Sequence, residues 1–98
     1  MIALLSLWKI EAGHYDEMDG FAQSGPDMLG KSKGFVSAVY ISDKEKNEYG
    51  TLTVWETEED YKAAIQSLPK DVSNKLQSWA TEPPVNTTYY VNNAFSAE

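Results

Sequence analysis

The sequence predicts an α+β domain in which helices cover one face of an antiparallel β-sheet. Residues 35–55 form two strand-like runs separated by a charged turn. Residues 57–68 then follow the pattern of a capped amphipathic helix. A strand and a helix precede this unit, and a helix and a strand follow it. The predicted order is therefore β-α-β-β-α-α-β, a split βαβ arrangement.

The first half of the chain supplies a strand and a helix. Residues 2–10 form an apolar run interrupted only by Ser6 and Lys9, which predicts a strand. Residues 14–24 follow as a helix with apolar residues on one side, and Gly25-Pro26 ends it.

The central unit is the best defined part. Residues 35–41 and 49–55 are rich in β-branched and aromatic residues, which favour strands. The charged segment between them, residues 43–48, is short enough to close a hairpin. Thr57 precedes a helix with acids in its first turn, where a hydroxyl cap and negative charge are both favourable.

The last elements are a second helix and a final strand. Pro69 suits the start of a helix, and Val72, Leu76 and Trp79 continue an apolar stripe along it. Pro83-Pro84 stops this helix, and residues 85–91 read as the last strand.

Composition limits the classes of function. The 98 residues predict a single domain, 1–98, with a net charge of −7 and no cysteine. The eight Lys and Arg form no cluster, so neither nucleic acid nor an anionic membrane is an expected partner. Neither a signal peptide nor a membrane span is predicted, and the expected location is cytoplasmic.

Both faces of the predicted sheet are apolar. In the first strand Ile2, Leu4, Ser6 and Trp8 alternate with Ala3, Leu5 and Leu7, and helices can cover only one of these sides. An exposed aliphatic sheet face is typical of a partner surface, and a symmetric dimer is the commonest way to cover it. The sequence thus predicts a homodimer packed sheet to sheet. The alternative is a monomer whose C-terminal tail crosses that face.

A family resemblance follows from three features: the order of elements, Gly34-Phe35 at the start of the second strand, and Trp55-Glu56 leading into a helix. In these the chain resembles the antibiotic biosynthesis monooxygenase family from residue 2 to about residue 90. The resemblance implies a dimeric ferredoxin-like α+β barrel. It is less specific for activity, because the scaffold serves cofactor-free oxygenases, haem-degrading enzymes, isomerases and proteins with no established reaction.

The resemblance also implies a site between the sheet and the helices. Trp55 and Tyr61 match the strand-end tryptophan, and the tyrosine six residues later, of family members that oxidise polyketides. Their N–H and O–H groups are candidate catalytic donors to a developing oxyanion, with no cofactor. A small aromatic or enolic ligand is expected among aromatic walls and hydroxyls. The candidate substrate-binding residues are Ser6, Trp8, Thr51, Thr53 and Trp79.

The chain differs from the family at positions that particular activities depend on. The polyketide oxidisers carry an asparagine where this chain has Thr51. Haem-degrading relatives bind iron through a histidine after the third strand, and no histidine lies between Glu56 and Pro83. Their first-strand asparagine corresponds to Ser6. These differences argue against haem degradation.

Each candidate has a simpler interpretation. Trp55, Tyr61, Trp8 and Trp79 are also suited to core packing. His14, the single histidine, is a candidate general base, but it also suits a solvated or capping position, and no carboxylate at a clear spacing holds it. The neighbouring acids Glu56, Glu58, Glu59 and Asp60 suit a helix N-terminus better than a metal site, and no metal is predicted.

Two functional hypotheses follow. The first is a cofactor-independent monooxygenase-like enzyme acting on a small aromatic or enolic compound, with His14 or the substrate's own acidity accounting for proton loss. The second is a non-catalytic dimeric module of the same fold that binds a small molecule or another protein.

Overall fold

The computed structural model describes residues 1–23 and 29–94, and within them the predicted order of elements is confirmed. The predicted end of the first helix at Ser24 and the Gly25-Pro26 stop lie outside the described residues. The elements are β1 (Ile2–Lys9), α1 (Tyr15–Ala22), β2 (Phe35–Asp43), β3 (Glu48–Trp55), α3 (Glu58–Gln66), α4 (Lys70–Trp79) and β4 (Val85–Tyr90).

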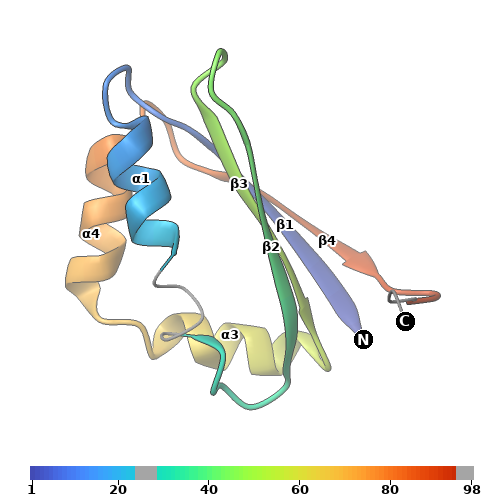
Figure 1. The fold of residues 1–98 in the computed structure, drawn as a ribbon. Helices are drawn as coiled ribbons and strands as arrows, with labels where there is room; N and C mark the ends of the chain where they lie inside the picture. The colour runs from blue at the N-terminus through green and yellow to red at the C-terminus, as the bar shows by residue number, and fades with distance from the viewer. Residues whose placement is uncertain (24–28, 95–98) are drawn as a thin grey trace.

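The four strands form one antiparallel sheet in the order β2-β3-β1-β4. The helices α1, α3 and α4 all lie on one side of it (Figure 1). This is the ferredoxin-like arrangement, with β1 and β3 at the centre of the sheet. The register is continuous along β1 and β3, and β2 carries one β-bulge between Phe35 and Ser37.

The register decides which side chains face the helices. Ile2 lies opposite Trp55, Leu4 opposite Thr53, and Ser6 opposite Thr51. Directly opposed residues point to the same face of a sheet. Ile2, Leu4, Thr53 and Trp55 are buried, so this face is the covered one. The sequence-based assignment of these residues to one face is confirmed.

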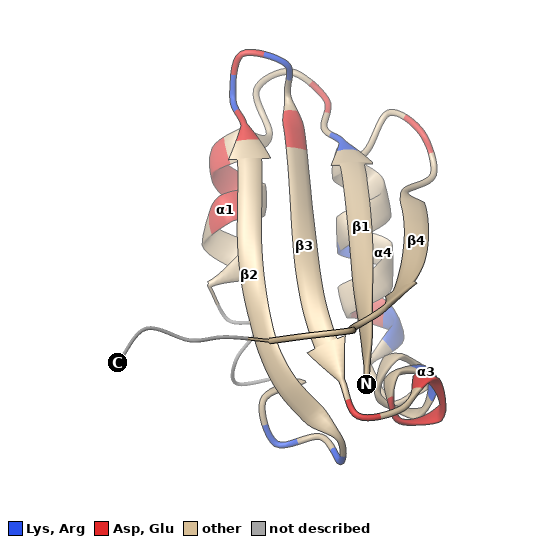
Figure 2. Cartoon of the chain, turned by 90° about the vertical axis from the view of Figure 1, so that its right-hand side faces the viewer, with Lys and Arg blue, Asp and Glu red and all other residues tan. Residues whose placement is uncertain are grey.

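The opposite face of the sheet carries no helix (Figure 2). Its side chains are largely aliphatic. Leu5 pairs with Leu52, and Leu52 with Val39. Val39 is 53% exposed. After β4, residues 91–94 lie on this side of the sheet and pass in front of β1 and β3 as seen in Figure 2. We call the side chains of this face the open face; its exposed members include Leu7, Val39, Ile41, Val85 and Tyr89.

Two clusters make up the core between sheet and helices. The first gathers Ile10, Met18, Ala22 and Tyr49 beneath α1 and α4. The second gathers Ile2, Trp55 and Ala64 beneath α3. Space remains between the two clusters, over the middle of β1 and β3, because the residues there are smaller (Ser6, Thr51 and Thr53).

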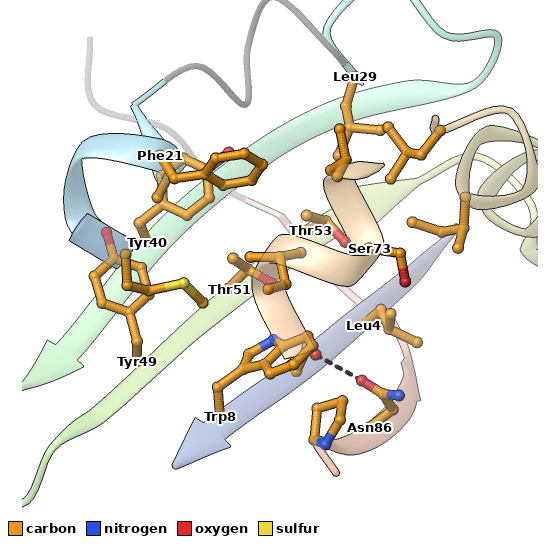
Figure 3. A pocket seen from close by; sticks show the side chains of 18 of the residues that line it. Leu4, Trp8, Phe21, Leu29, Tyr40, Tyr49, Thr51, Thr53, Ser73 and Asn86 are labelled. Atoms are coloured by element: carbon orange, nitrogen blue, oxygen red, sulfur yellow. Dashed lines mark hydrogen bonds between the residues drawn. The ribbon is translucent and has the colours of Figure 1, made fainter. Parts of the chain in front are cut away.

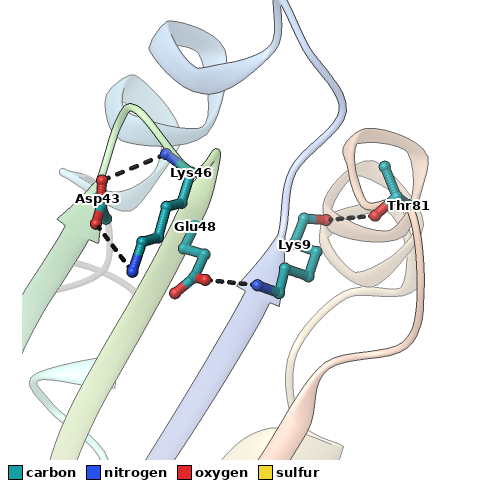
Figure 4. Close-up of polar contacts among 5 residues, drawn as sticks. All are labelled: Lys9, Asp43, Lys46, Glu48 and Thr81. Atoms are coloured by element: carbon teal, nitrogen blue, oxygen red, sulfur yellow. Dashed lines mark hydrogen bonds and ion pairs between the residues drawn. The ribbon is translucent and has the colours of Figure 1, made fainter.

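Polar contacts close the hairpin at the far end of the sheet (Figure 4). The backbone N–H of Lys46 donates to Asp43 Oδ1 at 3.3 Å, and Asn47 adopts a positive φ of 52°. Lys9 Nζ donates to Glu48 Oε1 at 2.5 Å across β1 and β3. The predicted charged turn is therefore observed, with β2 running two residues further than the predicted residue 41.

The junction between β3 and α3 is fixed by a cap and a close approach. Thr57 Oγ1 accepts a hydrogen bond from the Asp60 N–H at 3.1 Å, as the sequence predicts for a helix cap. Gly34 has a φ of +81°, and its carbonyl oxygen accepts from the Glu56 N–H at 2.8 Å. A Cβ at Gly34 would collide with the Asp60 side chain. None of the described helices is long and apolar enough to span a membrane.

Candidate active site

A cavity of about 350 Å³ lies between the sheet and the helices, over the small residues of β1 and β3. Figure 3 shows Trp8, Thr51 and Thr53 projecting from the strands into it beneath α4. The floor consists of Leu4, Ser6 and Trp8 from β1 and Thr51, Thr53 and Trp55 from β3. Its walls come from α1, β2, α3 and α4, and include Met18, Phe21, Tyr40, Tyr61, Ile65, Val72 and Leu76. The lining is thus mainly apolar and aromatic, with hydroxyls concentrated on the floor.

Six of the eight candidate site residues line this cavity. They are Ser6, Trp8, Thr51, Thr53, Trp55 and Tyr61. Trp79 and His14 are not among the described residues that line the cavity. Trp79 instead packs its ring edge-on against Phe21, with centroids 5.7 Å apart, beside the first core cluster.

His14 lies at the N-cap position of α1, without a side-chain capping bond. Its Nδ1 is 3.0 Å from Glu17 Oε1. The expectation that no carboxylate holds this histidine was therefore wrong, because the first turn of α1 brings the residue three positions later alongside it. The pair is exposed, so its surroundings are those of the solvated, helix-entry alternative.

Trp55 is completely buried, with 0% of its surface exposed. The rings of Phe35 and Tyr61 pack edge-on against it, at centroid distances of 5.3 and 5.8 Å. Its indole Nε1–H donates to Thr53 Oγ1 at 2.9 Å. The N–H that the sequence suggested for a ligand is therefore engaged within the protein.

Tyr61 lines the cavity from α3 and is half-buried. Burial raises the pKa of its hydroxyl above the usual value near 10. A tyrosine hydroxyl is neutral at physiological pH even with its usual pKa, so this group is available as a hydrogen-bond donor. Tyr61 is therefore placed at the cavity and is also in contact with the core through the Trp55 ring.

A second tyrosine anchors the α1 end of the cavity. Tyr49 donates its hydroxyl to Asp19 Oδ1 at 2.8 Å. Burial, followed by this hydrogen bond to the Asp19 carboxylate, raises the pKa of Tyr49 strongly. Its ring contacts Tyr15, with centroids 5.9 Å apart. Tyr49 therefore fixes α1 to the sheet and keeps this wall in place.

Asn86 and Lys70 are lining residues that the sequence did not single out. Asn86 lies opposite Ser6 on β4 and accepts a hydrogen bond from Ser6 Oγ at 2.6 Å (Figure 3). Its amide therefore has its N–H groups left to donate. Lys70 begins α4 and is the cationic residue in the described lining. The alternation of β4 could have suggested Asn86, once β4 was paired with β1.

The described residues contain no group of three or more His, Cys, Asp or Glu side chains placed to hold a metal ion. The acids after β3 are spread along the first turn of α3, as expected for a helix N-terminus.

Comparison with known proteins shows the fold. No protein-family model matches the sequence, and no curated protein matches it. Solved structures do match, at low sequence identity. A candidate antibiotic biosynthesis monooxygenase from Nitrosomonas europaea superposes with a TM-score of 0.84 at 9% identity, covering 95% of this chain and 100% of the other. SnoaB, a cofactor-independent oxygenase from Streptomyces nogalater, gives 0.78 at 13% identity, covering 98% and 97%.

A conserved protein from Methanosarcina mazei Go1 gives a TM-score of 0.80 at 16% identity, covering 90% of this chain and 89% of the other. The chain therefore has the α+β ferredoxin-like fold of the antibiotic biosynthesis monooxygenases, as the sequence resemblance implied.

Proposed function

We propose that this chain is an oxygenase-type enzyme that uses no tightly bound cofactor and acts on a small aromatic or enolic compound. The observation that carries the proposal is the cavity of about 350 Å³, with its aromatic walls and hydroxyl-bearing floor. Its size and mixture of apolar surface with a few polar groups suit a flat, partly polar organic molecule. SnoaB, which shares the fold, is a cofactor-independent oxygenase, and this supports the same class of chemistry here.

The reaction needs O2 as its only co-reactant. An enol or phenol in the cavity loses a proton, and a carbon of the resulting electron-rich anion forms a bond to one oxygen of O2. Cleavage of the O–O bond releases the second oxygen as water and leaves a carbonyl on the substrate. In the keto tautomer of this substrate the reacting carbon is a CH₂ group. Its oxidation to the carbonyl supplies all four electrons that reduce O2, so no external reductant is required.

The protein's part is to orient the substrate, exclude water and stabilise the anion. Tyr61, whose neutral hydroxyl belongs to a residue of the cavity lining, is one donor. Trp55 shapes the same end of the cavity through its contacts with Tyr61 and Thr53. Because His14 is not in the described lining, the substrate's own acidity accounts for proton loss in this proposal.

The proposal is tested first by tryptophan fluorescence titrations with polycyclic phenols, small quinols and haemin. A phenol or quinol that quenches saturably is then tested for oxygen uptake. Trp55→Phe should lower turnover at least about tenfold with the fold retained, since it disturbs the donor end of the cavity. Tyr90→Phe, an exposed aromatic change outside the lining, is the matched control. Unchanged turnover in Trp55→Phe would remove the role of Trp55.

The second candidate is a non-catalytic module that binds a small molecule in the same cavity. Thr51 in place of the asparagine of the polyketide oxidisers favours it, as does the engagement of the Trp55 N–H by Thr53. This candidate predicts saturable binding with no oxygen consumption above the uncatalysed rate.

We also propose that two copies pack through the open face to form the dimeric barrel. The exposed aliphatic side chains of β1, β2 and β4 support this arrangement. The single domain over residues 1–98 and the cytoplasmic location stay predictions.

A further inference from the structure

The hydrogen bond between Trp55 and Thr53 determines which of the two side chains can donate a hydrogen bond to a ligand. An indole has one N–H donor and no acceptor. That N–H donates to Thr53 Oγ1 at 2.9 Å, and the pair is buried. Trp55 is also held in this orientation by the ring edges of Phe35 and Tyr61. Turning the N–H toward a ligand would require breaking the bond and repacking three rings.

Thr53 is left with the free donor. A hydroxyl has one proton and two lone pairs, and one lone pair here accepts from Trp55. The hydrogen bonds among the described residues give the Thr53 proton no acceptor. Thr53 is only 6% exposed, and it lies on the cavity floor between Leu4 of β1 and Ala38 of β2. A buried hydroxyl proton is therefore available at the cavity.

We propose that Thr53, rather than Trp55, donates the hydrogen bond to the oxyanion of the ligand, and that Trp55 is a positioning residue acting through it. This inference rests on the proposed function, because it assumes that a phenol or enol occupies the cavity. It assigns a donor to a position that the sequence placed only among the substrate contacts.

Two physical effects make the pair a better donor than an isolated hydroxyl. The indole N–H restricts the Thr53 side chain to the rotamer that places Oγ1 beside it, so the proton direction is limited in advance. Accepting a hydrogen bond also polarises the O–H and strengthens its own donation, an effect enhanced where water is excluded. Both effects favour the anionic form of a ligand over its neutral form.

The test uses 4-nitrophenol, whose phenolate absorbs visible light while the neutral phenol does not. Absorbance titrations across pH then give the affinity for each form and the pKa of the bound phenol. In the wild-type protein, the bound pKa should lie below the value in water. Thr53→Val should raise the bound pKa by about one unit, which corresponds to about tenfold weaker binding of the phenolate relative to the phenol.

Three further variants separate Thr53 from Trp55. Thr53→Ser keeps the hydroxyl and should restore the wild-type bound pKa. Trp55→Phe should raise it by less than Thr53→Val does, because it removes only the polarising donor. The double variant Thr53→Val/Trp55→Phe should match Thr53→Val alone, and it also avoids leaving the indole N–H buried without an acceptor. Circular dichroism checks that each variant is folded.

The outcomes distinguish this inference from the function on which it rests. No saturable binding of 4-nitrophenol to the wild-type protein would overturn both. Binding with a bound pKa unaffected by Thr53→Val would overturn the role of Thr53 alone. If Trp55→Phe shifts the bound pKa equally with and without the Thr53 hydroxyl, Trp55 acts on the ligand directly. The proposal that it acts through Thr53 would then be wrong.

Discussion

Trp55 and Thr53 are two residues apart on β3, so their side chains leave the sheet on the same face. This much the sequence could predict, and it placed both at the site. The bond from Nε1 to Oγ1 depends on side-chain torsions, which residue spacing does not determine. The polar chemistry of individual residues was therefore less predictable than their placement.

Tyr49 gives a testable consequence at this scale. Its hydroxyl donates to Asp19, so Tyr49→Phe should lower the free energy of unfolding by about 1 kcal/mol. The raised pKa also fixes a pH dependence. The unfolded chain ionises Tyr49 near pH 10 while the folded chain keeps it protonated, so stability is retained below about pH 10 and falls above it. Urea denaturation at pH 7 to 12 measures both effects.

The control for this measurement is Tyr90→Phe, since Tyr90 is 86% exposed. Between pH 10 and 12, the decline in stability should be shallower in Tyr49→Phe than in wild type and should keep the wild-type slope in Tyr90→Phe. Equal slopes in all three proteins would show that Tyr49 does not contribute to the alkaline loss of stability.

At the scale of elements, prediction worked best where one pattern dominated. The alternation predicted β3 to within a residue, and the cap predicted where α3 begins, whereas α3 ends two residues before the predicted residue 68. β4 was harder, because Asn86, Thr87 and Thr88 are all polar and do not show which side is covered. Only its pairing with β1, which brings Asn86 opposite Ser6, assigns it to the cavity. The covered face of β4 therefore follows from its register with β1 and not from its own sequence pattern.

The start of β2 offers a test of an element boundary. Gly34→Ala should destabilise the protein by more than the about 1–2 kcal/mol expected for a non-glycine residue in the left-handed region, because its Cβ would also collide with Asp60. Gly13→Ala is the matched control, since Gly13 has a φ of +92° with no atom within 4 Å of the added Cβ.

The collision can be separated from the backbone strain with Asp60→Ala. Thermal denaturation should show that Asp60→Ala recovers part of the loss in Gly34→Ala and none of the loss in Gly13→Ala. Equal losses in the two alanine variants would mean that the contact with Asp60 relaxes at no cost.

For the whole molecule, the open face is the surface through which we propose that two copies pair. The sequence predicted an aliphatic second face from alternation alone, and the exposed side chains of the open face confirm its chemical character. In Figure 2 the charged residues of the strands gather at one end, and the rest of the face carries none. Such a surface is suited to a second copy of the chain.

The corresponding prediction concerns mass in solution. Light scattering after gel filtration should give twice the chain mass of 11.0 kDa for the wild-type protein. Val39→Lys places a charge on the open face and should shift the mass toward that of one chain. Ala63→Lys, on the exposed side of α3, should leave the dimer intact. A monomeric wild-type protein would favour the alternative in which the chain covers its own sheet.

β3 contributes both to the cavity and to the open face. Thr51, Thr53 and Trp55 face the cavity, while Leu52 and Val54 face the open side between them. Substitutions on either set can be accepted separately, but inserting or deleting one residue would exchange the two sets. Leucine and valine would then line the cavity, and hydroxyls would cover the surface proposed for pairing. Relatives that keep this site should therefore vary the composition of β3 and conserve its length.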